Sequence, residues 1–274
     1  MNTYGIPQTL LSIREYGGPK VGENSPALIE DRFAYALQFD NDAHLKIPNN
    51  WVSSSIGTWG IDRGEIPVLT HEVRFKPDSK QHMHLMSSRD NDDTLSWAIV
   101  LQHTGSYSGS DQYGRLLFAL AGDNGAASAS ITDYVPLYDG NYWNLSISVD
   151  TVNNTPNTNT TYTLRCQQAS DYITGKIIHK TDVALAPTNA SHSIYWGSPD
   201  DLGASHILRL GGGIGGQDDY SVKAALSAAF AVMPGKTTVT NNESISGELI
   251  SNSFIGSMQE YRGWLEEIDQ ATFD

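Results

Sequence analysis

Two histidines in the stretch QHMHLM are the first residues whose type and spacing indicate chemistry. His82 and His84 are two positions apart, so on a β-strand they point to one face, where two imidazoles can begin a zinc site. Such a site needs at least a third protein ligand from another strand, and the sequence marks no Cys or carboxylate for that role. We therefore interpret the pair as part of a polar sheet face that meets solvent or a partner.

Paired carboxylates, which most glycoside hydrolases use, are the next chemistry to consider. Retaining enzymes hold two carboxyl groups about 5 Å apart and inverting ones hold them somewhat farther apart. On one strand this requires acids two or four residues apart, yet Glu72 is alone on its strand and Glu260 lies in the closing stretch. HEVRF has Phe75 where H-E-x-x-H needs its second His, and GSYSG (105–109) lacks the strand-to-helix context of a serine nucleophile. We therefore predict that the chain is not an enzyme.

A glycine-rich stretch, LRLGGGIGGQDDY (208–220), contains the pattern G-x-G-x-x-G at Gly211, Gly213 and Gly216. A dinucleotide site needs this run to open a helix whose N-terminus holds the pyrophosphate. QDDYS does not read as a helix opening with an apolar stripe, and no second βα unit follows. We interpret the stretch as a loop between strands.

Oxygen-bearing side chains cluster at Asp40, Asn41 and Asp42, where a predicted strand ends. Calcium takes roughly six to eight oxygen ligands, so further oxygens must come from other loops, with Asp92-Asp93 and Asp218-Asp219 as candidates. Ordinary turn formation by Asn and Asp explains the same residues without a metal. Two hypotheses follow for a cofactor. Either Asp40 and Asp42 hold a calcium ion, or the protein has no cofactor.

Length and charge limit the classes of protein. The 274 residues suffice for one large β domain, and the single cysteine, Cys166, excludes an internal disulfide. The net charge of −14 argues against nucleic acid as a partner, because such a chain repels phosphate backbones. The N-terminal residues lack the basic start and apolar run of a signal peptide, and no stretch approaches the roughly 18 apolar residues of a membrane helix. We expect neither nucleic-acid binding nor membrane insertion.

Alternating apolar and polar residues predict β-strands along most of the chain. In LTHEVRFKPD (69–78), for example, Val73 and Phe75 alternate with charged residues. Other predicted strands are 33–40, 44–48, 82–88, 95–102, 114–122, 141–150, 161–168, 192–198, 206–213, 225–233 and 254–264. Only 170–186 and the C-terminal stretch offer a pattern from which a helix could form. The predicted fold class is all-β: a two-sheet antiparallel jelly-roll sandwich with a short C-terminal helical turn.

Residues 1–32 differ in character from the rest. They contain three prolines, a Gly-Gly pair and one apolar cluster at Leu10, Leu11 and Ile13. We interpret them as an extended N-terminal arm attached to a domain that spans 33–274. The arm either docks on a neighbouring subunit or folds back as an edge strand of its own sandwich.

Four segments follow one another along the chain: YALQFDNDAHLKIP (35–48), HEVRFKPD (71–78), YDGNYWNLSISVD (138–150) and FIGSMQEYRGWLEEIDQATF (254–273). Their order resembles the laminin-G-like, or concanavalin-A-like, jelly-roll domains over about residues 33–273. The resemblance implies that MQEYRGW is a central or near-central strand with Tyr261 or Met258 buried. It places Met258, Glu260 and Arg262 on one face, and it implies a calcium site at one rim. Versions of this family occur in phage and giant-virus particle proteins.

Two functions remain open, since a fold does not decide function. The first is a non-catalytic structural or interaction module, a virion or phage particle component whose partners are other protein subunits. The second is a glycan-binding, lectin-like module for surface attachment, for which loop aromatics are the candidate ligand-binding residues: Trp51, Trp59, Tyr107, Tyr113 and Tyr220. Either function places the protein at the surface of a virion or another extracellular particle.

Overall fold

The computed structural model describes residues 36–40, 42–48, 68–89, 93–103, 109–122, 127–150, 161–169, 177–186, 196, 207–213, 221–230, 252–264, 267–268 and 273. Within these residues the chain forms strands β1 to β12 and the helix α4. The predicted arm at 1–32 and its boundary with the domain lie outside them, as do most of the predicted strand at 192–198 and most of the predicted C-terminal helical turn.

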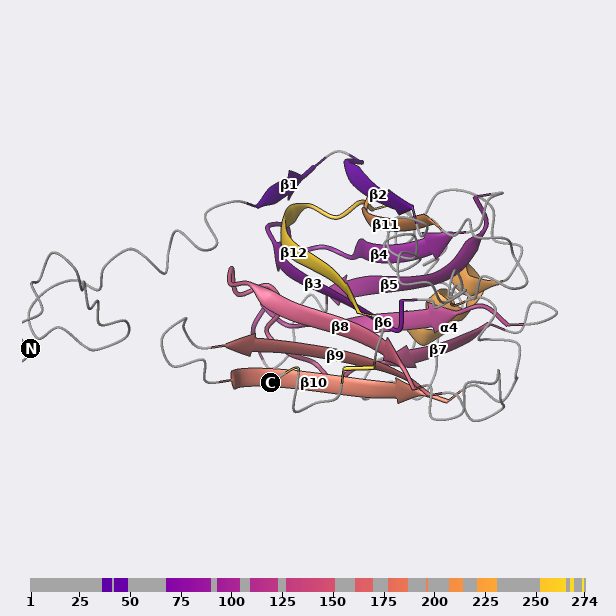
Figure 1. Cartoon of the computed structure of the whole chain (residues 1–274). Coiled ribbons are helices and arrows are strands. Elements are labelled where there is room, and N and C mark those ends of the chain that lie inside the picture. The colour runs from indigo at the N-terminus through magenta and orange to yellow at the C-terminus, as the bar shows by residue number, and fades with distance from the viewer. Residues whose placement is uncertain are drawn as a thin grey trace, which may run out of the picture.

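The strands form two antiparallel sheets that face each other (Figure 1). Sheet A has the order β1 (Leu37–Phe39), β12 (Gly256–Trp264), β3 (Thr70–Pro77), β8 (Trp143–Val149), β9 (Tyr162–Ala169), β10 (Ile177–Leu185). Sheet B has the order β2 (His44–Pro48), β11 (Ile207–Gly211), β4 (Met83–Arg89), β5 (Leu95–His103), β6 (Gly114–Leu120), β7 (Ser128–Ile131). The prediction of an all-β antiparallel sandwich is confirmed.

The core lies between the sheets and follows the alternation of the sequence. In β3, Val73 and Phe75 are buried, whereas the charged residues that alternate with them are only partly covered. Each sheet also contributes one large indole, Trp97 from β5 and Trp143 from β8, and both are fully buried in this core. Burying side chains of this size contributes about 1.5–3 kcal/mol each, so the alternation determines which face of each strand turns inward.

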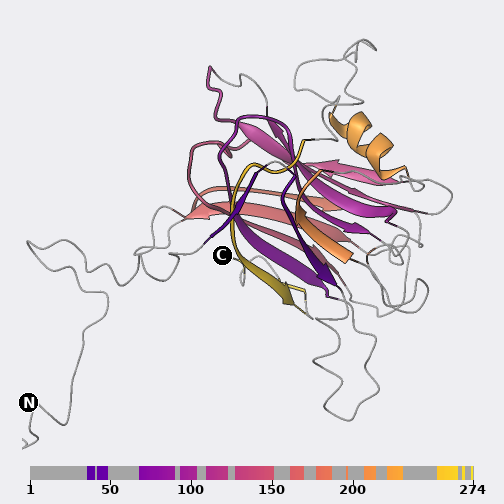
Figure 2. The same ribbon diagram turned by 90° about the horizontal axis from the view of Figure 1, so that it is seen from above.

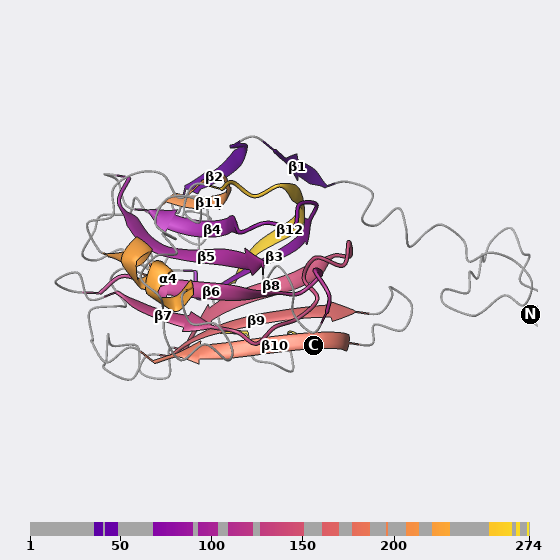
Figure 3. The ribbon, with the colours of Figure 1, turned by 180° about the vertical axis from the view of Figure 1, so that it is seen from behind.

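Residues 225–233, predicted as a strand, instead belong largely to the helix α4 (Val222–Phe230). The prediction was wrong because the run is rich in alanine, the strongest helix former, and a short apolar run does not separate the two states. Val222, Leu226 and Phe230 recur at helical spacing, and all three are buried. They pack on the outer face of sheet B, against a second apolar cluster that includes Leu117 of β6. Figures 2 and 3 show α4 outside the sandwich on this side.

The stretch 170–186, considered above as a possible helix, contains the edge strand β10. It pairs with β9 from Ile177 to Leu185, with a bulge between Ile177 and His179. The bulge breaks the alternation and so obscures the strand in the sequence. The short strand β7 was also not predicted, because its residues SASI are small and mostly polar.

The closing strand β12 lies second from the edge of sheet A, between β1 and β3. Met258 is buried, as predicted. The predicted grouping of Met258, Glu260 and Arg262 on one face is wrong, because a bulge interrupts the register between Gln259 and Arg262 and Glu260 has a φ of 51°. After the bulge Tyr261 packs against the core, whereas Arg262 is exposed opposite Glu72.

The structure describes only residues 267, 268 and 273 of the predicted C-terminal turn; residue 273 is helical, and the turn itself stays a prediction. Trp196 is a helical residue buried in the core. None of the helices within the described residues has the length and apolar character needed to span a bilayer.

Candidate ligand-binding site

The predicted calcium ligands lie in the turn by which the chain passes from sheet A to sheet B. Asp40 follows β1 and is exposed, and its carbonyl accepts a hydrogen bond from the amide of Ala43 at 2.8 Å. Asp42 adopts a left-handed conformation with a φ of 69°, and its carboxylate accepts a hydrogen bond from Ser253. Asx residues commonly form such turns. Among the described residues no group of three His, Cys, Asp or Glu side chains could hold a metal ion, so calcium here stays a prediction.

The acidic residues suggested as further ligands are Asp92-Asp93 and Asp218-Asp219, of which the structure describes Asp93 alone. Its carboxylate lies 2.6 Å from Arg209 Nη2, and its carbonyl accepts a hydrogen bond from the buried Arg89 at 3.0 Å. Asp93 therefore links the end of β4 to the middle of β11. Two arginines already use its oxygens.

Of the five aromatic residues proposed to bind a ligand, only Tyr113 is described. It is half-buried and directly precedes β6. Trp51, Trp59, Tyr107 and Tyr220 lie outside the described residues. An aromatic rim formed by these loops remains a prediction.

His82 and His84 face the side of sheet B that carries α4, where His82 is half-buried and His84 is buried. The ring of His82 packs edge-on against Phe230 of α4 at 4.6 Å, and its Nδ1 accepts a hydrogen bond from the amide of His103. His84 is fully buried, and its Nδ1 lies 2.7 Å from the carbonyl oxygen of Gly212. Burial lowers the pKa of each histidine to about 4. For His84 the interpretation as a polar residue that meets solvent is therefore wrong, because it is a neutral, fully buried packing residue. For the half-buried His82, a polar face that meets a partner stays a prediction.

The glycine stretch has a structural role at its first two positions. Gly211 ends β11 with a φ of 68°, and a Cβ placed there would lie 2.5 Å from the ring of Phe39. Gly212 follows with a φ of 71° and accepts the hydrogen bond of His84. A helix, α4, does begin at Val222, contrary to our expectation that none follows. The close approach of Phe39, rather than a phosphate, accounts for Gly211.

The outer face of β3 carries a group of charged residues that the sequence analysis did not single out. Glu72, Arg74 and Lys76 alternate with the buried residues of β3 and therefore share this outer face. Arg74 lies 5.0 Å and Lys76 5.5 Å from the centre of the Tyr142 ring at the start of β8. Two cations and one aromatic ring thus meet on a rigid sheet.

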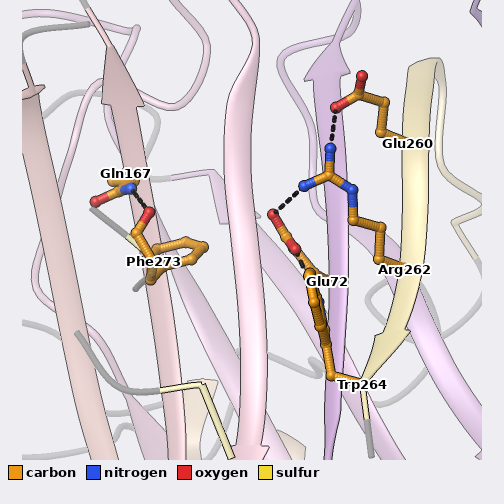
Figure 4. Close-up of polar contacts among 6 residues, drawn as sticks. All are labelled: Glu72, Gln167, Glu260, Arg262, Trp264 and Phe273. Atoms are coloured by element: carbon orange, nitrogen blue, oxygen red, sulfur yellow. Dashed lines mark hydrogen bonds and ion pairs between the residues drawn. The ribbon is translucent and has the colours of Figure 1, made fainter. Parts of the chain in front are cut away.

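The neighbouring strand β12 completes this group, as Figure 4 shows. Arg262 Nη1 lies 3.5 Å from Glu72 Oε1, and Arg262 Nη2 lies 3.2 Å from Glu260 Oε2. The indole of Trp264 donates a hydrogen bond of 3.0 Å to the other oxygen of Glu72. We call the set Glu72, Arg74, Lys76, Tyr142, Glu260 and Arg262 the charged patch. Exposed ion pairs contribute only about 0–1 kcal/mol each, so these contacts orient the side chains more than they stabilise the fold.

Two described residues of the C-terminal segment, Ile268 and Phe273, lie over the part of the same face that β3 and β9 form. The amide of Ile268 donates to the Thr70 hydroxyl at 3.1 Å, and Arg165 donates to the Ile268 carbonyl at 3.0 Å. Farther on, Gln167 donates to the carbonyl of Phe273 at 2.6 Å (Figure 4). The charged patch lies beside this covered region, where Arg262 keeps about half of its side-chain surface exposed (49%).

The two carboxylates of the patch are not arranged like the acid and base of a glycosidase. Both of its carboxylates, Glu72 and Glu260, are ion-paired to the guanidinium of Arg262, which lies between them. A glycosidase instead leaves one carboxyl group protonated to act as the acid. The signal in the sequence was the run of alternating charges in HEVRFKP, but only the strand order brings Tyr142 and Arg262 to either side of it.

Comparison with known proteins finds similarity in structure only. No protein-family model and no curated protein matches the chain. The Ruminococcus gnavus IT-sialidase CBM40 is similar with a TM-score of 0.42 and 11% identity, over 86% of this chain and 92% of that one. The LG1-3 region of the laminin alpha2 chain is similar with a TM-score of 0.38 and 13% identity, over 85% and 32%. A heptameric SAP-like pentraxin from Limulus polyphemus has a TM-score of 0.37 and 13% identity, over 74% and 67%.

A laminin G region is thus among the structures similar to this chain. Because these TM-scores lie below 0.5, we infer function from the residues of this chain alone.

Proposed function

We propose that the protein is a non-catalytic binding module whose ligand surface is the charged patch, and that its ligand is an acidic glycan. The single observation that supports this best is the Tyr142 ring, which lies beside Arg74 and Lys76 on the outer face of β3 and β8. An aromatic surface with a few polar groups directed at one place is the usual form of a small-ligand site. Carboxylate or sulfate groups on a sugar would supply the charge that these cations prefer.

The charge of the patch differs from that of the whole chain. The patch has three cations and two carboxylates, and Lys76 also lies 3.6 Å from the carboxylate of Asp78, whereas the chain has a net charge of −14. Three cations gathered on an otherwise acidic chain attract anionic groups more than the rest of its surface does. This favours an anionic ligand over a neutral one.

The test is binding measured by calorimetry, with a uronic-acid oligosaccharide and its neutral counterpart as probes. We expect the acidic probe to bind, and we expect Arg74→Gln or Lys76→Gln to weaken binding by about 10- to 150-fold, as for loss of a hydrogen bond to a charged group. Lys46→Gln on sheet B removes the same charge far from the patch and serves as the matched control. Equal binding of the two probes, or equal loss in the control, would contradict the proposal.

A second proposal concerns the setting of the module: a component of a virion or phage particle, at the particle surface, that binds other protein subunits through residues 1–32. One observation favours a docking role. Leu37 of β1, at the edge of sheet A just after the arm, has 55% of its surface exposed. Exposed apolar residues at a sheet edge favour pairing with another chain.

Deletion of residues 1–32 separates the alternatives for the arm. If the truncated protein keeps its unfolding midpoint but no longer enters the particle or binds its partner subunits, the arm docks on neighbours. If it unfolds or aggregates as a monomer, the arm is part of the domain and the particle role loses its support.

A further inference from the structure

Strand β10 is a long edge strand of sheet A: β9 is its one hydrogen-bonded neighbour among the described strands, and β10 also approaches β7, the edge strand of sheet B (Figure 1). Its nine residues, Ile177–Leu185, include five exposed positions, among them Ile178, which has 47% of its surface exposed. Edge strands present unpaired backbone groups and are commonly protected by short length, by proline, by charged side chains, by a bulge or by a covering segment. β10 is long and contains no proline, but it has a bulge between Ile177 and His179 and carries Lys180 and Asp182, so any strand that pairs with it must match these charges.

The charges of β10 are arranged symmetrically about Thr181. Lys180 and Asp182 flank it on either side and are both exposed. In β10 these two residues lie opposite Gln167 and Arg165 of β9, so they share the outer face of sheet A. Two antiparallel copies of β10 centred on Thr181 would place each Lys180 directly opposite the Asp182 of the other copy. Opposite charges in directly facing cross-strand positions stabilise pairing.

The alternative registers are unfavourable. Continuous pairing of two copies requires outer-face residues to meet outer-face residues, because directly opposite side chains share a face. If the register between the two copies is shifted in one direction, Lys180 lies opposite Lys180 of the other copy. If it is shifted in the other direction, Asp182 lies opposite Asp182 of the other copy. Like charges directly opposite each other destabilise pairing. Only the register centred on Thr181 pairs both charged residues favourably.

Thr181 itself adds a second observation. Its side chain is buried at 6% exposure, and its hydroxyl has no hydrogen-bond partner among the described residues. Threonines directly opposite each other on paired strands can form a hydrogen bond across the pair. The same register also sets the exposed Ile178 against Ala184 of the other copy.

We propose that β10 is the interface of a two-fold homodimer, in which the partner is a second copy of this chain and the two copies of sheet A join into one continuous sheet. The interface is isologous, since the same strand serves both copies. This inference does not depend on the ligand of the charged patch.

The experiment measures molar mass by light scattering during size exclusion of the full chain, at about 0.15 M salt, where the Debye length of about 8 Å limits general repulsion between acidic chains. We expect a dimer for the natural sequence. Lys180→Asp places like charges opposite each other and should give a monomer. The double variant Lys180→Asp with Asp182→Lys restores opposite charges and should restore the dimer.

The matched control is Lys46→Asp on β2, the edge strand of sheet B, which changes the net charge equally and should leave the dimer intact. A monomer for the natural sequence at tens of micromolar, a dimer that survives Lys180→Asp, or a double variant that stays monomeric would each overturn the proposal.

Discussion

The hydroxyl of Tyr261 lies 2.9 Å from Nδ1 of His71, although the two residues are 190 positions apart. His71 is buried among aromatic rings, with Trp97 and Trp196 each 5.5 Å from its centre. Burial lowers the pKa of His71 to about 3, so the ring is neutral at pH 7. The bulge at Glu260 turns Tyr261 inward to meet it. This contact joins the closing strand to the core.

Tyr261→Phe should destabilise the fold by about 1–3 kcal/mol, because it leaves a polar atom of His71 buried without this hydrogen bond. The measurement is the free energy of unfolding in urea at pH 7. Tyr142→Phe, which removes a hydroxyl from the half-buried ring of the charged patch, is the control and should change stability by less than about 0.5 kcal/mol. If the two variants lower the free energy of unfolding equally, the hydrogen bond between Tyr261 and His71 does not stabilise the fold.

Stability should fall as the pH is lowered from 7 to 5. His71 and His84 are buried, and burial lowers their pKa values to about 3 and about 4. Below the unfolded-state value of about 6.5, the unfolded chain binds protons that the folded chain does not, so each group removes up to about 1.4 kcal/mol of stability per pH unit. The stability that they contribute is therefore fully present above pH 6.5 and is lost as the pH falls toward the folded values.

Urea unfolding at several pH values, with His84→Gln beside the natural sequence, checks this assignment. Glutamine keeps a donor for the Gly212 carbonyl but does not titrate, so the slope of stability against pH should become shallower by about 1.4 kcal/mol per unit. An unchanged slope would mean that His84 does not titrate on unfolding.

Leu226→Ala should cost about 2–5 kcal/mol, the usual range for a buried leucine. Leu226 is fully buried between α4 and sheet B, so its loss leaves a cavity in the second apolar cluster. Ala228→Lys, at an exposed position of the same helix, should change the free energy of unfolding by no more than about 0.5 kcal/mol. If Leu226→Ala costs as little as Ala228→Lys, α4 does not pack on sheet B as described.

Gly211→Ala should be more harmful than Gly140→Ala, although both glycines have positive φ, 68° and 83°. A side chain in this backbone region costs about 1–2 kcal/mol in either case. At Gly211 the new Cβ would also lie 2.5 Å from the Phe39 ring, whereas at Gly140 it would meet nothing within 4 Å. Thermal unfolding of the two variants measures the difference. Equal midpoints would imply that Phe39 moves aside freely.

The sequence by itself determined the architecture and most of the inner faces. Alternation in stretches such as 69–78 and 141–150 depends on neighbouring residues alone, because side chains two apart on a strand share a face. Val73, Phe75 and Trp143 are accordingly buried. The same alternation places Glu72, Arg74 and Lys76 on the opposite, outer face of β3.

Only the tertiary structure decided three further features. The alanine-rich run around Leu226 has a pattern that fits a strand or a helix, and packing on sheet B selects the helix. The bulge at Glu260 reverses which residues of β12 face the core, and it arises from pairing with β3. The charged patch combines Arg74, Tyr142 and Arg262 from three strands that neighbour one another in the sheet but not in the chain. Strand order depends on how residues far apart in the sequence pack together in the core, and local periodicity carries no information about it.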